Sequence, residues 1–527
     1  PGEGFAGQQP RDPLHVVFTR SDSLICLRRV HSDVLVEGDS LMARAVRRSN
    51  IDPVIASFPV KCKAPDGSSV FEATSFFVNG APAMRPHDPY GINSFGGFLS
   101  TTVNYVAGCS LLSGVEAFAD NVSVLSSLSF TLTTRFGGYL INKDTPYTAL
   151  ARRSLMLLPR EVMMPRLCDS RIGTVPVAFV KFSDREQEAK AVYYACRWNL
   201  KPSDPAAFAA GKLTTPERPI VFYVDDTFPA GWYDAIRRGL LSWNAAFEKI
   251  GYRDAVQVRP YPRDDASFDP NDIKFSCVKY ANTMGESLSS SARIDPRSGE
   301  ILSATICIPH NVTSRIRTDL FVQLGAADPD ARRVKMSPEL FGKALTADVA
   351  RHTGACLGLA VNYAGSYCVP VDSLRSPSFT QRYGISASIM DELPYNLVAQ
   401  PGDKERGVAL MQQGPGVYDE YVVDWLYRPV PGAATPEDEV AELDRRIAAR
   451  RSDPMCLYTP PPVAVALDPR SMPYNLGDDP VRAAAYEFAN YAYVMKHADE
   501  WIGEEDADYT FRSLVQASVM NQLYYAF

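Results

Sequence analysis

The first 200 residues contain short stretches in which apolar and polar side chains alternate. These stretches are rich in β-branched and aromatic residues and are separated by Asp, Gly and Ser turns, a pattern that predicts β-strands. Examples are LHVVFTR (14–20), SLICLRRV (23–30), IASFPVKCKA (55–64) and VSVLSSLSFTLTTRF (122–136). Residues 65–79 (PDGSSVFEATSFFVN) predict a hairpin, because a Pro-Asp-Gly turn leads into an alternating strand. We therefore expect a β-rich N-terminal domain over residues 1–200.

The pattern changes after a polar, proline-containing connector at residues 199–219. Residues 230–252 predict one amphipathic helix that stops at Gly251, because apolar side chains recur every three to four residues on one face. That face consists of Trp232, Ile236, Leu240, Trp243, Phe247 and Ile250. Predicted strands flank this helix at PIVFYVDD (219–226), VQVRPY (256–261), DIKFSCVKY (272–280) and EILSATICIP (300–309).

A second long helix is predicted to begin at Ser337, which is suited to capping a helix N-terminus, with Pro338 in the first helical position. Gly358 is expected to end this helix. The order strand, helix, strands, helix predicts an α/β domain over residues 201–430. After a proline-rich connector, two more helical patterns predict a helical C-terminal region over residues 431–527. The expected fold class is therefore α+β and multidomain.

Composition and charge exclude several classes of function. The 527 residues are 46% hydrophobic and 22% charged, which is ordinary for a soluble globular protein. The net charge of -7 argues against nucleic acid as a partner, since phosphate binding needs a concentrated basic surface. The ten cysteines include no C-x-x-C pair, which argues against zinc-ribbon and thioredoxin-type sites. The sequence also contains no P-loop, no G-x-G-x-x-G and no G-x-S-x-G motif.

Residues 351–361, RHTGACLGLAV, resemble the metzincin zinc motif H-E-x-x-H-x-x-G-x-x-H in frame but not in ligands. The resemblance places Gly358 at the turn glycine and His352 at the position of the general-base glutamate. It places Arg351, Ala355 and Val361 at the three ligand positions. Arginine stays cationic, and alanine and valine have no ligand atom, so the resemblance implies a site that no longer binds zinc.

The sequence after the helix extends the resemblance. The stretches VDSLRSP (371–377), SIMD (388–391) and QPGD (400–403) are similar to segments of the large zinc-dependent metalloproteases of bacterial envelopes, a metzincin-like family. The likeness covers at least residues 196–496. It implies a metzincin-like central domain with a mixed sheet and two long helices, in which Met390 occupies the Met-turn. It also implies a retained structural frame that consists of Gly358, Asn362, Met390 and Asp391.

The residues at the motif positions allow more than one interpretation. His352 and Cys356 are four residues apart and, with Cys368 or Asp372, would form a relocated metal site. The plainer interpretation is a packed histidine and a buried thiol, or a disulfide between Cys356 and Cys368.

Arg351, Met390 and the segment before His310 also have two interpretations each. Arg351 either replaces the charge of the metal and pairs with a carboxylate such as Asp391, or extends into solvent. Met390 is either a relic of the Met-turn or core filler. The strand predicted at residues 300–309 is a candidate for the substrate-binding edge strand of metzincins, and His310 and Asn311 after it are expected to be structural.

The resemblance implies a catalytically inactive protein that acts as a binding or scaffold subunit of a bacterial cell-envelope complex. We expect no cofactor, no metal and no nucleic acid. The expected partners are outer-membrane proteins or lipoproteins, together with an extended peptide bound by β-augmentation. Export and outer-membrane association through an N-terminal lipid anchor are expected from the resemblance alone. The alternatives are an active metallopeptidase with a non-standard metal site and a regulator of an active paralogous protease.

Overall fold

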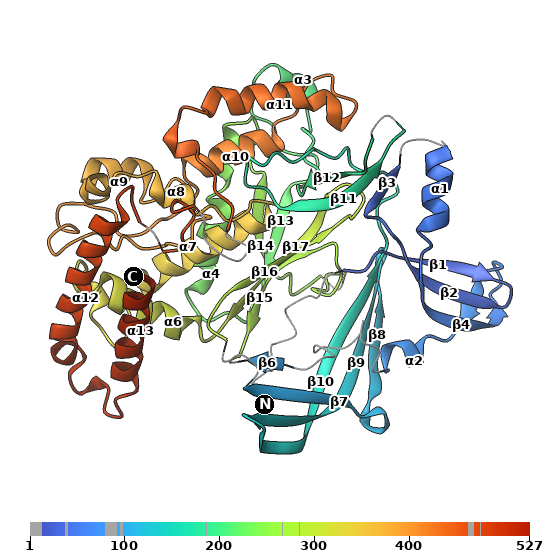
Figure 1. Cartoon of the computed structure of the whole chain (residues 1–527), viewed down its shortest axis with the longest axis horizontal. Coiled ribbons are helices and arrows are strands. Elements are labelled where there is room, and N and C mark those ends of the chain that lie inside the picture. The colour runs from blue at the N-terminus through green and yellow to red at the C-terminus, as the bar shows by residue number, and fades with distance from the viewer. Residues whose placement is uncertain are drawn as a thin grey trace. The chain divides into compact units, whose positions relative to one another are not determined.

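The chain forms two compact units in a computed structural model (Figure 1). The structure describes residues 13–36, 41–79, 92–94, 98–184, 187–265, 267–283, 285–461, 468–474 and 476–526. Unit 1 comprises Pro1–Arg160, Phe179–Ala191 and Asp269–Lys274, and unit 2 comprises Glu161–Ala178, Val192–Phe268 and Phe275–Phe527. The division into three domains at residues 200 and 430 stays a prediction.

Unit 1 contains a four-stranded antiparallel sheet in the order β1-β2-β4-β5. Its strands are β1 (Val16–Ser21), β2 (Leu24–Arg29), β4 (Val54–Lys63) and β5 (Ser69–Phe71). The predicted hairpin is present, and Gly67 adopts the positive φ of 84° that its turn requires. The strand predicted through residue 79 is wrong beyond Phe71, because helix α2 (Thr74–Phe77) forms there and buries Phe76 and Phe77 in the core.

Longer strands build a second sheet in unit 1, in the order β10-β9-β7-β6 with β8 paired to β9. Its members are β6 (Ile92–Ser94), β7 (Leu99–Tyr105), β8 (Leu111–Ala117), β9 (Asn121–Phe136) and β10 (Tyr139–Met156). A three-stranded sheet has the order β12-β11-β3, with β3 at Val34–Val36, β11 at Pro176–Phe182 and β12 at Lys190–Ala195. Helix α1 (Leu41–Ser49) interrupts the strands. The prediction of a β-rich N-terminal region is confirmed.

Unit 2 is built on a mixed five-stranded sheet in the order β14-β13-β15-β17-β16. Its strands are β13 (Ile220–Val224), β14 (Val256–Pro260), β15 (Ser276–Ala281), β16 (Ser289–Ile294) and β17 (Ile301–Pro309). The first four in spatial order are parallel, and β16 pairs antiparallel to β17 at the edge. The interpretation of residues 300–309 as an edge strand is therefore wrong. β17 is buried at every position except Leu302, as suits a strand with neighbours on both sides.

The two predicted long helices of unit 2 lie against each other and contribute to its core. The predicted helix at residues 230–252 is two helices, α4 (Trp232–Leu241) and α5 (Asn244–Glu248), separated at Ser242, whose hydroxyl donates to Gly239 O at 2.7 Å. All six residues of the predicted apolar face are buried. α7 (Pro338–Cys356) begins as predicted, with Ser337 Oγ accepting from the Leu340 N–H at 3.2 Å. Thr346 of α7 donates to Ala235 O of α4 at 3.2 Å, which joins the two helices.

The remaining helices of unit 2 surround this core. They are α3 (Pro205–Ala209), α6 (Val312–Asp319), α8 (Ala364–Tyr367), α9 (Pro377–Tyr383), α10 (Val417–Tyr427), α11 (Pro436–Arg450), α12 (Pro480–Ile502) and α13 (Thr510–Ala526). A second apolar cluster joins α12 and α13 to residues 321–326. The α+β multidomain class and the helical C-terminal part are confirmed. Among the residues described, no helix is long and apolar enough to cross a membrane.

Candidate functional site

The C-terminal end of α7 forms the turn that the sequence predicted. Gly358 has a φ of 87°, and its N–H donates to Ala355 O at 3.1 Å while the Leu359 N–H donates to Gly354 O at 3.1 Å. These two bonds are the Schellman pattern, which satisfies carbonyl groups at a helix end. A Cβ at Gly358 would overlap the carbonyl oxygen of Cys196. Both the backbone angle and the close approach therefore require glycine at this position.

Backbone hydrogen bonds hold the chain after the turn in place. The Val175 N–H donates to Gly358 O at 2.8 Å, and the Ala360 N–H donates to Gly173 O at 3.0 Å. Val361, which the resemblance placed at the third ligand position, follows in a half-buried loop. Next to it, Asn362 is fully buried. Its side chain donates to Leu457 O at 2.9 Å and accepts from the Thr459 N–H at 3.2 Å, so Asn362 anchors the loop.

The side chains at the motif positions form a chain of polar contacts from α7 to the edge strand β16. Arg351 Nη2 lies 3.3 Å from His352 Nε2, and His352 Nδ1 lies 3.0 Å from Ser290 Oγ. A guanidinium can only donate, so Nε2 accepts and Nδ1 carries the proton that is shared with Ser290. Burial, followed by the charges of Arg351 and Arg315, lowers the pKa of His352 to about 3. The imidazole is therefore neutral at physiological pH. Ala355, one turn after Arg351, adds only a methyl group.

Asp391 is not the partner of Arg351. The Asp391 carboxylate is buried and accepts from the Ser366 N–H at 2.7 Å and from Ser386 Oγ at 3.3 Å. Burial raises the pKa of Asp391 to about 7. Within the described ranges, Arg351 forms no ion pair, and the contact at its guanidinium is the one with His352. The charge of Arg351 is therefore not neutralised by the carboxylate that the sequence suggested.

Met390 is a core residue that packs on the face of α7 at Gly354. It is 3% exposed, and a Cβ built on Gly354 would overlap Met390 Sδ and lie 2.5 Å from Cζ2 of Trp243. The segment that carries Met390 is held by Asp419, which accepts from Ser388 Oγ at 2.5 Å and from the Ile389 N–H at 2.7 Å. Sequence reasoning missed Asp419, although an aspartate three residues after Gly416 at the start of α10 fits a capping position.

The relocated metal site is not assembled. Burial raises the pKa of the Cys356 thiol to about 12, and Cys368 Sγ donates to Gly365 O at 3.0 Å. Asp372 pairs with Arg482, whose Nη1 lies 3.0 Å from Asp372 Oδ2. All ten cysteines are free thiols, so the disulfide between Cys356 and Cys368 is absent. No three His, Cys, Asp or Glu side chains in the described part of the chain are grouped so that they could hold a metal ion.

His310 and Asn311 make structural contacts. His310 Nδ1 lies 2.7 Å from the Tyr280 hydroxyl, and its ring stacks on Trp232 with an interplanar angle of 5°. The Asn311 amide donates to Glu286 at 3.2 Å.

Comparison with known families agrees with this geometry. Residues 333–527, which include α7, the glycine turn and the Met390 segment, match the model of a family described as Met-zincin. This part of the chain is metzincin-like. Residues 7–203 match a family described as a domain of unknown function (DUF5117). No curated protein and no solved structure matches the chain. The resemblance of this region to metzincins is thus confirmed. The loss of the zinc ligands stays a prediction, and so does the role of the frame residues carried over from the family.

Proposed function

We propose that this protein is a catalytically inactive metzincin-like protein that acts as a binding or scaffold subunit. The observation that carries the proposal is the contact of Arg351 with His352 and of His352 with Ser290. In the metzincin frame these two α7 positions belong to a metal ligand and to the general base. Here one is a permanent cation, and the other is a neutral imidazole that is already hydrogen-bonded to the neighbouring strand.

The electrostatics of this arrangement oppose a metal at the usual position. A tetrahedral zinc site needs three or four N, S or O donors, whereas Ala355 and Val361 supply none. The guanidinium of Arg351 has no lone pair to donate, and its charge repels a divalent cation. The proposal therefore assigns the helix and its turn a structural role.

Binding is proposed to use the outer edge of β16, which pairs with no further strand among the described residues. This strand is the last of its sheet, and its residues Ser289–Ile294 are all half-buried. An edge strand presents unpaired N–H and C=O groups that an extended peptide can pair with. Three consecutive serines, Ser289 to Ser291, leave little side-chain bulk in the way.

The family resemblance supports a location and a set of partners. We propose that the protein is exported and associates with the outer membrane through a lipid anchor, as a subunit of a complex with other envelope proteins. Affinity purification from native envelopes would test this. Recovery of a stoichiometric outer-membrane protein or lipoprotein supports the scaffold role, and recovery of an active paralogous protease supports the regulator instead.

Turnover of an unfolded protein separates the binding role from catalysis. We expect purified protein to leave reduced, carboxymethylated lactalbumin intact, with added zinc and with a chelator alike. Cleavage that the chelator abolishes would instead establish the alternative, an active metallopeptidase with a non-standard metal site.

Peptide binding at β16 has its own test, which uses two neighbouring proline substitutions. Successive N–H groups of an edge strand alternate between the partner strand and solvent, so Ser291→Pro and Ala292→Pro remove groups on opposite sides. We expect one variant to lose affinity for fluorescein-labelled carboxymethylated lactalbumin without a change in melting temperature. The other is expected to melt earlier, because it breaks the pairing with β17. Unchanged anisotropy titrations in both variants would rule out the edge as the binding surface.

A further inference from the structure

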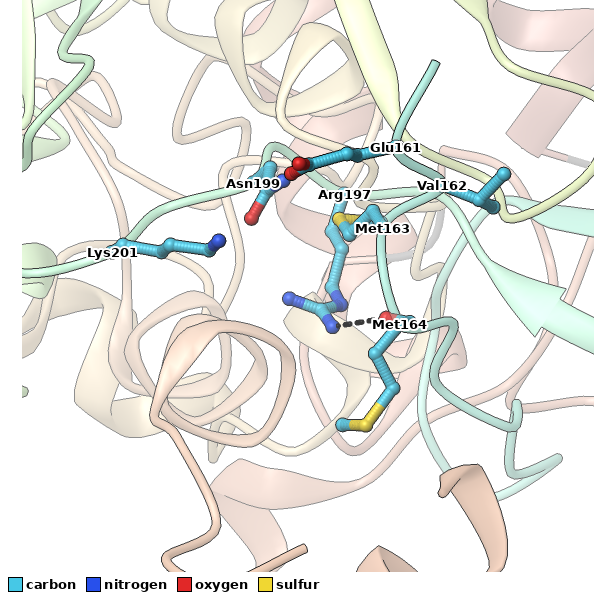
Figure 2. Close-up of a pocket in the computed structure, with 7 residues that line it drawn as sticks. All are labelled: Glu161, Val162, Met163, Met164, Arg197, Asn199 and Lys201. Atoms are coloured by element: carbon cyan, nitrogen blue, oxygen red, sulfur yellow. Dashed lines mark hydrogen bonds between the residues drawn. The ribbon is translucent and has the colours of Figure 1, made fainter. Parts of the chain in front are cut away.

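Unit 2 contains a cavity that shares no residue with the α7 motif. It has a volume of about 260 Å³. Its walls come from two short segments, 161–164 and 197–201, which lie side by side (Figure 2). The lining residues are Glu161, Val162, Met163, Met164, Arg197, Asn199 and Lys201.

Arg197 is a cation without a carboxylate partner. Its Nη2 donates to Met164 O at 2.9 Å, while its Nε is buried and has no hydrogen-bond partner. Within the residues described, this guanidinium forms no ion pair, although the charges of Glu439 and Glu300 act on it from a greater distance. Burial, followed by repulsion from Arg166, lowers the pKa of Arg197 to about 10. Uncompensated buried charges are costly, so buried cations in proteins are normally paired.

The nearby Arg166 shows how this fold neutralises a buried arginine. Arg166 forms a bidentate pair with Glu439, with Nε–Oε2 and Nη2–Oε1 distances of 2.8 and 2.6 Å. Both side chains are 2% exposed. The carboxylate of Glu439 is therefore committed to Arg166. The charge of Glu300 also acts on Arg197, but the two form no ion pair in the described part of the chain, and open space lies beside the guanidinium.

A second cation lies at the same cavity. Lys201 is exposed and, like Arg197, forms no ion pair in the part of the chain that the structure describes. Figure 2 shows its side chain extending toward the space that the Arg197 guanidinium also faces, with the Asn199 amide beside it. The Glu161 carboxylate lies next to Asn199 in this view, and it forms no ion pair with either cation. Val162, Met163 and Met164 supply the apolar part of the lining.

We propose that this cavity binds a small organic anion whose oxyanion group, a carboxylate or a phosphate, pairs with Arg197 and Lys201. The planar fork of a guanidinium matches the two oxygens of such a group, and charge-assisted hydrogen bonds of this kind are strong. The carbon skeleton of the anion contacts the methionine side chains. Glu161 limits the negative charge that the site accepts and offers an acceptor to a ligand hydroxyl or ammonium group. This site is independent of the proposed scaffold function.

The test compares two charge reversals on exposed lysines of the same unit. Sodium succinate and inorganic phosphate are titrated at constant ionic strength, with sodium chloride as the reference, and the melting temperature and the heat of binding are recorded. Lys201→Glu places a carboxylate at the cavity, whereas Lys212→Glu makes the same change in net charge at a lysine that does not line it. A saturable rise in melting temperature is expected for the parent protein and for Lys212→Glu, and its loss is expected for Lys201→Glu.

Arg197→Met provides a second variant, which is expected to weaken binding by about tenfold or more because a charged hydrogen bond is lost. A response to succinate alone assigns a carboxylate ligand, and a response to phosphate alone assigns a phosphate ligand. The proposal is overturned if neither anion gives a saturable response. It is also overturned if Lys201→Glu and Lys212→Glu reduce the response equally, since that result would reflect surface charge rather than a site.

Discussion

Gly354 determines how closely Met390 and Trp243 approach helix α7. An alanine at this position would overlap Met390 Sδ and lie 2.5 Å from the Trp243 ring. Gly342, on the same helix, has room for a methyl group, since its Cβ would lie at van der Waals distances of 3.5 Å from Arg238 Nη2 and 4.0 Å from Ala235 Cβ.

We therefore predict stability changes of opposite sign for two chemically identical substitutions. Gly354→Ala should lower the free energy of unfolding by about 1–3 kcal/mol through overpacking. Gly342→Ala should raise it by about 0.5–1 kcal/mol, because alanine is the better helix former. Urea unfolding of both variants checks this. Equal effects would show that Met390 and Trp243 do not pack on α7 as described.

Asp391 gives a prediction for pH dependence. Its pKa is raised to about 7 by burial, whereas an unfolded aspartate has a pKa of about 3.9. Between these values the folded protein binds more protons than the unfolded chain, so the free energy of unfolding falls as pH rises from about 4 to about 7. Asp391→Asn should remove up to about 1.4 kcal/mol per pH unit of this fall. The contribution of Asp419 to the pH dependence remains in this variant, because the pKa of Asp419 is also raised to about 7. A variant whose stability still follows the parent profile in urea unfolding between pH 4.5 and 7.5 would contradict the assignment.

At the level of residues, the sequence predicted those whose roles are local. Ser337 as a helix cap, Gly358 as a helix end and the apolar face of residues 232–250 all follow from short-range patterns. The partners of Arg351 and Asp391 were not predictable from the sequence. Asp391 accepts hydrogen bonds from Ser366 and Ser386, and Arg351 contacts His352. These contacts depend on how several loops pack.

Two ion pairs connect helix α11 to the segment before β11, and they differ in their exposure to solvent. Arg166 and Glu439 form a buried pair, whereas Arg171 and Asp444 pair at 2.6 Å with both side chains more than half exposed. Removing one partner of a buried pair leaves an uncompensated charge, but surface pairs contribute little.

Neutralising the two acids should therefore have unequal effects. Glu439→Gln is predicted to cost about 3–5 kcal/mol of unfolding free energy, and Asp444→Asn less than about 1 kcal/mol. The melting temperatures of the two variants, measured side by side, check this. Similar shifts would mean that the Arg166 pair is open to solvent.

At the level of elements, the kinds of element and most of their bounds were predictable from the sequence, but the neighbours of each element were not. The strand predicted at residues 300–309 is present as β17. Only its pairing with both β15 and β16 shows that the strand is internal. The segment at residues 74–77 was predicted to continue a strand but forms a helix, in which two adjacent phenylalanines are buried in one turn. A periodic pattern does not reveal the break at Ser242, where the serine hydroxyl donates to Gly239 O.

At the level of the whole molecule, the α+β class was predictable because the pattern of apolar and polar residues changes along the chain. The resemblance to metzincins was predictable because it rests on long collinear motifs. The composition of the compact units was not, since unit 1 includes two short segments, Phe179–Ala191 and Asp269–Lys274, that are distant in sequence. The cavity around Arg197 was equally hidden, because it needs residues 161–164 and 197–201 to meet.

Our main proposal is that the α7 frame persists without side chains that can hold a metal. Its most direct test is the zinc content of the purified chain after equilibration with zinc and removal of the excess, measured beside a variant with the full motif restored. That variant is Arg351→His, His352→Glu, Ala355→His and Val361→His combined. We expect no bound zinc in the parent protein and one zinc per chain in the restored variant, because the helix and its turn are already in place. One zinc per chain in the parent, lost on His352→Ala, would show that the proposal is wrong.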